Sequence, residues 1–111
     1  MDKRKFIESI KESLIELLKE RGISVELIVV FGSYATGKER DDSDIDIIVV
    51  SKDFRDKDIF EIVEQTKDIH GELVERFMKP FDIMYYSDLD WEEGHSLIIN
   101  SAKEEGEIIY L

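Results

Sequence analysis

The sequence contains no cysteine, a single proline and no long apolar run. Without cysteine it forms no disulfides and no thiolate metal site. No stretch approaches the ~20 apolar residues of a membrane span, and no signal peptide precedes the first charged helix, so we expect a cytoplasmic protein. Basic residues are outnumbered by acidic ones, since 15 Lys and Arg against 27 Asp and Glu give a net charge of −12. This charge repels polyanions, which argues against nucleic acid as a direct partner and favours cations or a basic protein surface.

The remaining composition is typical of one folded domain. A hydrophobic share of 42% over 111 residues suffices for a single modest core. We therefore expect one domain over residues 1–111, with an α/β (α+β) fold. The apolar pattern and the turn residues predict helices over 3–21, 59–77 and 88–106, and strands over 25–31, 45–50, 81–86 and 107–111. A short helical turn over 33–36 and an interruption of the second helix at Gly71 are further expectations.

Acidic residues stand at the starts of two predicted strands. Asp44 and Asp46 are two residues apart, so their side chains project to the same side of the strand. Two ionised carboxylates about 4 Å apart repel by roughly 4 kcal/mol at an effective dielectric of about 20, so the pair needs a proton, a basic residue or a metal ion. Asp82, the second residue of a later strand, is expected to point to the same place. Three converging carboxylates are the oxygen ligands that Mg²⁺ prefers.

Two other interpretations of these carboxylates are possible. An isolated Asp-x-Asp often caps a turn or pairs with a distant lysine. Asp42, Asp44 and Asp46 also match the first ligand positions of a calcium-binding EF-hand loop. That loop requires a glycine where this chain has Ile47 and a glutamate where it has Asp53, so the calcium interpretation fails.

A Gly-Ser pair directly follows the first predicted strand. Gly32 lacks a side chain, so a phosphate group could approach the backbone N–H groups there, and the hydroxyl of Ser33 could donate to it. Lys38 and Arg40 lie in the loop before the carboxylates. Loop cations of this kind are more often solvated than bound to phosphate, so both stay outside the candidate site.

Gly32-Ser33, ten intervening residues, Asp44-x-Asp46 and the later Asp82 form a pattern of higher specificity than any of its parts. The pattern resembles the minimal nucleotidyltransferases of the DNA polymerase beta superfamily, and the resemblance spans nearly the whole chain. It implies a nucleotidyltransferase fold, with a mixed β-sheet of about four strands flanked by helices. It also implies transfer of a nucleoside monophosphate, AMP from ATP, to a hydroxyl group with release of pyrophosphate.

The resemblance implies a role for each residue of the pattern. Asp44 and Asp46 would bind two Mg²⁺ ions, which in such sites lie ~3.5–4 Å apart. Asp82 would bind the ion that activates the acceptor hydroxyl and would help to take its proton. Gly32 and Ser33 would hold the β- and γ-phosphates of the nucleotide. The catalytic and metal-binding residues are thus the three aspartates, and the nucleotide-binding residues are the Gly-Ser pair.

The acceptor is expected to come from another molecule. Larger members of the resembled family carry extra domains that bind the acceptor, whereas this chain is about as long as the catalytic core. Stand-alone minimal members commonly act as antitoxins of a helical HEPN ribonuclease toxin, and some transfer AMP to a toxin tyrosine. The leading hypothesis is therefore a Mg²⁺-dependent protein adenylyltransferase that acts as an antitoxin. Two alternatives stay open: a non-catalytic subunit that neutralises its partner by contact, and an enzyme that modifies a small hydroxylated molecule.

Overall fold

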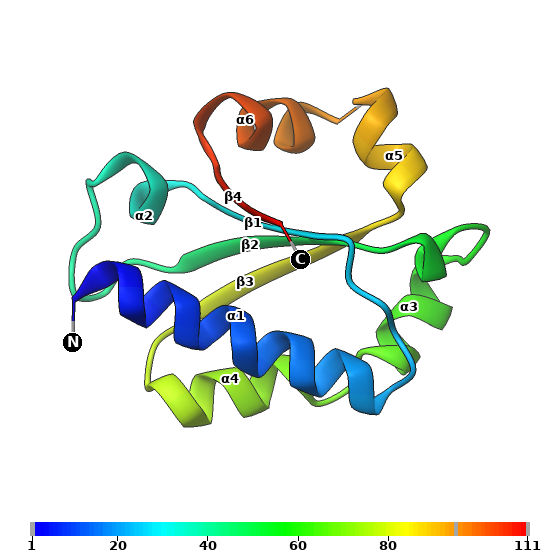
Figure 1. Cartoon of the computed structure of the whole chain (residues 1–111), viewed down its shortest axis with the longest axis horizontal. Coiled ribbons are helices and arrows are strands. Elements are labelled where there is room, and N and C mark those ends of the chain that lie inside the picture. The colour runs from blue at the N-terminus through cyan, green and yellow to red at the C-terminus, as the bar shows by residue number, and fades with distance from the viewer. Residues whose placement is uncertain (1, 95, 111) are drawn as a thin grey trace.

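A four-stranded mixed sheet lies at the centre of the computed structural model, which describes residues 2–94 and 96–110 (Figure 1). The strands are β1 (Leu27–Phe31), β2 (Ile45–Val50), β3 (Phe81–Tyr86) and β4 (Glu107–Tyr110). Their order across the sheet is β3-β2-β1-β4. β1 is antiparallel to both of its neighbours, and β2 is parallel to β3. The last residue of the strand predicted over 107–111 lies outside the described residues.

Helices cover both faces of the sheet. They are α1 (Lys3–Glu20), α2 (Ser33–Thr36), α3 (Ile59–Gln65), α4 (Ile69–Phe77), α5 (Asp88–Glu93) and α6 (Leu97–Glu105), with a 3-10 turn, η1, at Lys52–Phe54. Figure 1 shows α1 and α4 on one face of the sheet and α5 and α6 on the other. Among the described residues, no helix combines the length and the apolar character needed to cross a membrane.

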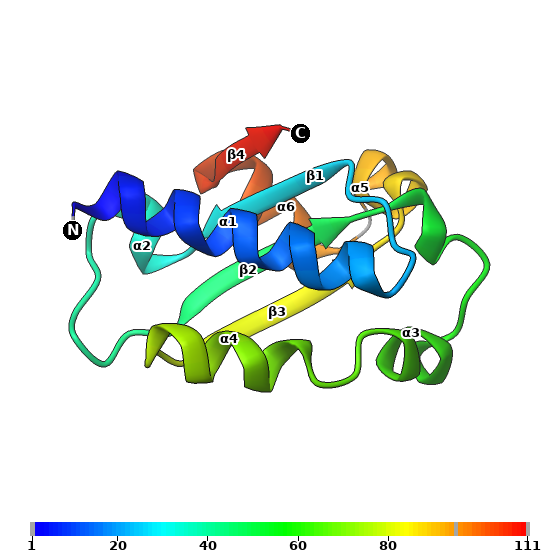
Figure 2. The same ribbon diagram turned by 60° about the horizontal axis from the view of Figure 1, so that its bottom comes forward.

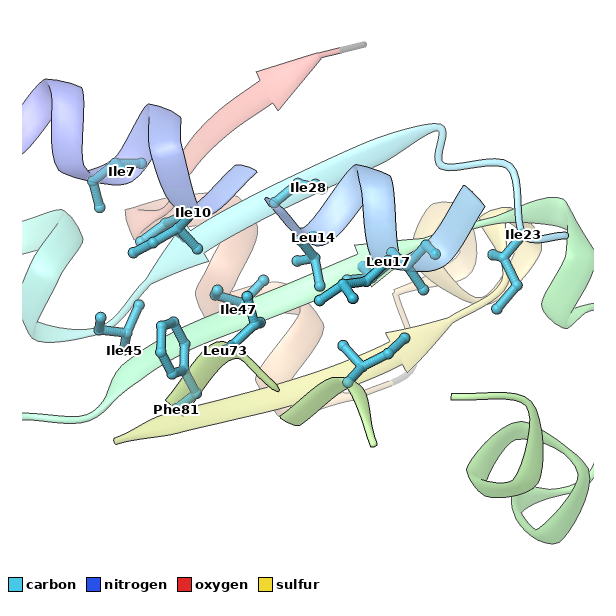
Figure 3. Close-up of a cluster of buried hydrophobic side chains, with 14 of the residues drawn as sticks. Ile7, Ile10, Leu14, Leu17, Ile23, Ile28, Ile45, Ile47, Leu73 and Phe81 are labelled. Carbon is cyan, nitrogen blue, oxygen red and sulfur yellow. The ribbon is translucent and has the colours of Figure 1, made fainter. Parts of the chain in front are cut away.

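The main core lies between α1, α4 and the sheet, as Figure 3 shows. The apolar residues of α1 recur every three or four positions, so they form one buried stripe, and the Asp2 carboxylate caps the first turn by accepting the N–H of Lys5. β2 contributes Ile45 and Ile47 to this core and Ile48 to a smaller cluster under α6. Burial on both faces explains why the strand sequences are apolar at successive positions, and it confirms that prediction.

The predicted helix over 59–77 was wrong as a single element, because it is divided into α3 and α4. The division lies at residues 66–68 and not at Gly71, which is inside α4. The hydroxyl of Thr66 donates to the carbonyl of Ile62 at 2.8 Å, and Asp68 adopts a φ of 70°. A left-handed residue cannot continue a helix, so the chain turns there even though its apolar pattern continues.

The predicted helix over 88–106 is also divided, into α5 and α6. Gly94 ends α5 with a φ of 64°, and the side chain of Ser96 caps α6 by accepting the N–H of Ile98. Both are ordinary helix-end signals placed within a continuous apolar pattern. The other predicted elements are confirmed, including the short α2 and the end of α6 at Gly106.

Candidate active site

The first residues of β2, β3 and α2 lie at the same end of the sheet (Figures 1 and 2). Because β2 and β3 are parallel, Asp46 and Asp82 are register partners, each the second residue of its strand. Side chains alternate along a strand, and the residues on either side of these two aspartates pack against α1 and α4. Asp46 and Asp82 therefore lie side by side on the opposite face, which is the face covered by α5 and α6.

Asp44 lies in the loop just before β2, and its side chain is exposed. Its charge still reaches Asp46. Burial raises the pKa of the half-buried Asp46 carboxyl, and the negative charges of Asp82 and then Asp44 raise that pKa further. The structure thus brings Asp46 and Asp82 together directly, and it places Asp44 at the entrance to the same strand.

These three carboxylates have no counter-charge among the residues that the structure describes. Within residues 2–94 and 96–110, no ion pair or side-chain hydrogen bond reaches Asp44, Asp46 or Asp82. Lys38 and Arg40 are exposed in the preceding loop and pair with none of them. Repulsion between the carboxylates is therefore left uncompensated by the protein.

Gly32 holds the backbone in a conformation that the site requires. Its φ of 72° and ψ of −149° belong to a region that is almost exclusive to glycine. A Cβ atom at this position would lie 2.2 Å from Oδ2 of Asp46, so the Asp46 carboxylate occupies the space that a side chain would need. Sequence reasoning assigned that space to a phosphate, and the contact with Asp46 had no signal in the sequence.

Ser33 is the first residue of α2 and is half-buried. The carbonyl of Gly32 accepts the N–H groups of Ala35 and Thr36, both at 3.1 Å. Among the described residues, no hydrogen bond reaches the N–H groups of Ser33 or Tyr34. Helix N-termini leave such donors free, and donors in this position suit an anionic group.

The chemistry of the aspartates fits a divalent cation. The described residues contain no group of three or more carboxylate, imidazole or thiol side chains already arranged to hold a metal ion. They do contain the close pair Asp46 and Asp82, with Asp44 next to it in an exposed loop. Carboxylate oxygens are the ligands that Mg²⁺ prefers, and a cation there would replace a repulsion by two attractions.

The chain matches a family of known proteins over most of its length. The family model described as polymerase beta, nucleotidyltransferase matches residues 12–111. This chain belongs to that family. Comparison with curated protein sequences gives no significant match. The Gly-Ser pair and the aspartates of this nucleotidyltransferase all fall within the matched residues.

Solved structures share the fold of this nucleotidyltransferase. A toxin–antitoxin structure with AMP-PNP is 22% identical with a TM-score of 0.60, over 87% of this chain and 69% of that chain. A mutant of the toxin–antitoxin MntA-HpeT is 20% identical with a TM-score of 0.57, over 97% of this chain and 72% of that one. A structure assigned as a minimal nucleotidyltransferase is 22% identical with a TM-score of 0.56, over 96% and 95% of the two chains.

A groove beside the aspartates was not found from the sequence. It has a volume of about 790 Å³, runs along the outer edge of β3 and includes Asp82 in its lining. Ile59, Ile62 and Val63 of α3 form one wall. One sequence feature is related to this groove, namely the several apolar residues of α3. The structure buries none of them.

Proposed function

We propose that this nucleotidyltransferase transfers AMP from ATP to a hydroxyl group of a partner protein, a HEPN-type toxin, and thereby acts as an antitoxin in the cytoplasm. The observation that carries the proposal is the pair of register partners Asp46 and Asp82, which lie on one face of the sheet with no counter-charge from residues 2–94 and 96–110. Support also comes from the fold neighbours, which include a toxin–antitoxin structure with AMP-PNP. The net charge of −12 suits a protein partner with a basic surface.

Each residue of the site has a part in this reaction. The N–H groups at the start of α2 donate to the β- and γ-phosphates, and Gly32, which has no side chain, leaves room for the Asp46 carboxylate next to them. Asp82 accepts the proton of the acceptor hydroxyl. The hydroxyl oxygen forms a bond to the α-phosphorus, the bond from that phosphorus to the bridging oxygen of the β-phosphate breaks, and pyrophosphate leaves.

Asp44, Asp46 and Asp82 are the residues that would hold two Mg²⁺ ions. Bound Mg²⁺ supplies Lewis-acid stabilisation of the charge on the phosphoryl oxygens. The raised pKa of Asp46 accords with this role, because a site that repels its own charges gains most from a cation.

Mass spectrometry of a toxin partner that is expressed and purified separately from this protein tests the proposal. After incubation of the purified partner with this protein, ATP and Mg²⁺, we expect the mass of the partner to increase by one AMP, and no increase when the chelator EDTA is present. An unchanged partner mass, with ATP still intact, would contradict the proposed reaction.

A second candidate is neutralisation of the partner by contact alone. The exposed apolar residues of α3, including Phe60 at 82% exposure, favour it because they offer a surface for a protein. Replacing Asp44 and Asp46 by asparagine separates the two functions. Loss of neutralisation with retained partner binding supports catalysis, and full neutralisation by the double variant supports contact.

A further inference from the structure

β3 is an edge strand whose outer side is open. It pairs with β2, whose Ile45 N–H donates to the carbonyl of Pro80 at 2.9 Å, and the N–H of Ser51 after β2 donates to the carbonyl of Tyr86 at 3.1 Å. Backbone groups of successive strand residues point to alternate sides, so the even-numbered residues of β3 bond to β2. The N–H and C=O groups of the odd-numbered residues therefore point away from the sheet.

These outward groups have few partners. The Nε2 atom of His70 lies 2.8 Å from the carbonyl oxygen of Phe81, which closes the edge at its first residue. For Ile83 and Tyr85, no hydrogen bond from any described residue reaches the backbone groups on the outer side. Unpaired strand edges of this kind bind a further strand readily.

The groove along this edge has an apolar wall. On α3, Ile59 is 70% exposed and Val63 is 60% exposed, and both line the groove. Figure 2 shows α3 near the end of β3. Phe60, on the same helix, does not line this groove. α3 thus presents Ile59 and Val63 to the groove as exposed apolar side chains, whereas Ile62 also packs against the main core.

The charged residues that line the groove favour a ligand with basic residues. Asp68, Asp82 and Asp90 line it together with one lysine, Lys67, so its lining is net negative, as is the whole chain. A strand that carries basic and apolar residues complements these charges. The groove also reaches the candidate active site, because Asp82 belongs to both.

We propose that this groove binds an extended segment of the partner protein as an additional strand on β3, and that this segment carries the acceptor hydroxyl. The proposal rests on the proposed function, since it names how the acceptor of that reaction is held. Neighbouring residues of paired strands place their side chains on the same face. The acceptor residue is therefore the one paired with Asp82, and the residues next to it in the segment are apolar and face α3.

A labelled peptide tests this binding mode. The peptide has one tyrosine within alternating valine and arginine residues, and its twin is N-methylated at every second amide. Fluorescence anisotropy measures binding to the full chain with ATP and Mg²⁺, and mass spectrometry measures transfer of AMP to the tyrosine. We expect the parent peptide to bind and to receive AMP, and the methylated peptide that lacks the N–H donors to bind about tenfold more weakly.

Two protein variants provide matched measurements. Val63→Lys places a cation in the groove and removes an apolar contact, so we expect about tenfold weaker peptide binding. Phe60→Lys makes the same kind of change at a residue of α3 that does not line the groove and should leave binding unchanged. Both side chains are exposed, and urea unfolding of the variants checks that the fold is retained.

Each outcome decides between the proposals. If the peptide does not bind while ATP with Mg²⁺ does, or if it binds equally after N-methylation or after Val63→Lys, the groove proposal is overturned. If sedimentation shows a dimer that Val63→Lys dissociates, the occupant is a second copy of this chain, which also overturns it. If ATP with Mg²⁺ does not bind and the peptide does, the proposed function fails and strand addition stands without the hydroxyl transfer.

Discussion

The carboxylates at the two ends of the parallel strand pair β2 and β3 differ in whether they have hydrogen-bond donors. At the far end, the Asp53 carboxylate accepts the N–H of Ser24 at 2.8 Å, and Nε of Arg55 donates to Asp88 at 2.7 Å. The hydrogen bond from Arg55 lowers the pKa of Asp88. At the starting end, Asp46 and Asp82 are side by side, and burial and repulsion raise the pKa of Asp46.

This difference separates structural carboxylates from candidate functional ones. Both ends belong to one sheet and use the same residue type, so residue identity alone does not explain the contrast. A carboxylate with a donor contributes to folding, whereas neighbouring carboxylates without donors oppose it. Neighbouring carboxylates without donors are candidates for binding a cation, because a bound cation removes the repulsion between their negative charges.

Removing the charge at the starting end should have the largest effect. In the variant with Asp44→Asn and Asp46→Asn, we expect AMP transfer to fall by about a thousandfold or more, since ion-mediated charge stabilisation is worth several kcal/mol. Transfer assays with labelled ATP measure the loss. Asp88→Asn is the matched control at the far end and should keep full activity, and equal losses in both variants would remove the contrast between the two ends.

Gly32→Ala should have the next largest effect. The backbone conformation alone costs about 1–3 kcal/mol for a residue with a side chain, and the new Cβ displaces the Asp46 carboxylate. We expect lower stability in urea unfolding together with lost transfer activity. Gly37→Ala is the control, because Gly37 also has a positive φ, but no atom of the described residues outside Gly37 and its two chain neighbours lies within 4 Å of a Cβ placed there. The Gly37→Ala variant should lose stability and keep its transfer activity. A Gly32→Ala protein with normal transfer activity would contradict the close contact between residue 32 and Asp46.

Asp46→Asn alone should stabilise the metal-free protein at neutral pH. The folded pKa of Asp46 is raised, so its favourable contribution is present below the unfolded pKa of about 3.9 and is lost as the pH rises through the folded pKa. The substitution removes this loss, and we expect a gain of about 0.2–1 kcal/mol, the scale of neighbouring charges on paired strands. Urea unfolding at neutral and at acidic pH measures it, and a gain that persists in acid would argue against a charge effect.

Asp88→Asn should have the smallest effect, with the opposite sign. The folded pKa of Asp88 is lowered by Arg55, so its contribution is present above the unfolded pKa and is lost as the pH falls through the folded pKa. We expect a slight loss of stability at neutral pH that disappears in acid, because the ion pair is exposed. Parallel unfolding curves for Asp46→Asn and Asp88→Asn should therefore shift in opposite directions, and shifts of equal sign would contradict the comparison.

Much of this fold could be predicted from the sequence, since β2 was placed at its observed bounds and α1 ends at the turn before Gly22. Local patterns specify these elements because burial alternates with a fixed period. The divisions at Asp68 and Gly94 were missed because the apolar pattern runs through both. A left-handed residue within such a pattern depends on tertiary packing, and a local sequence pattern carries no information about that packing.

The candidate site also has parts that the sequence predicted and parts that it did not. The type and spacing of Asp44, Asp46 and Asp82 pointed to one end of the sheet, because parallel strands bring their first residues together. The contact between Gly32 and Asp46 and the groove along β3 could not be predicted, since each depends on the distance between segments far apart in the chain. The open edge of β3 likewise follows from strand order, which the sequence does not state.

The most direct test of the central claim is anomalous diffraction from crystals grown with Mn²⁺ and a non-hydrolysable ATP analogue. Mn²⁺ takes oxygen ligands as Mg²⁺ does and gives a strong anomalous signal. We predict anomalous density coordinated by the carboxylates of Asp46 and Asp82, with the phosphates of the analogue against the start of α2. Density only at other carboxylates, or nucleotide bound with these two side chains free of metal, would contradict this claim.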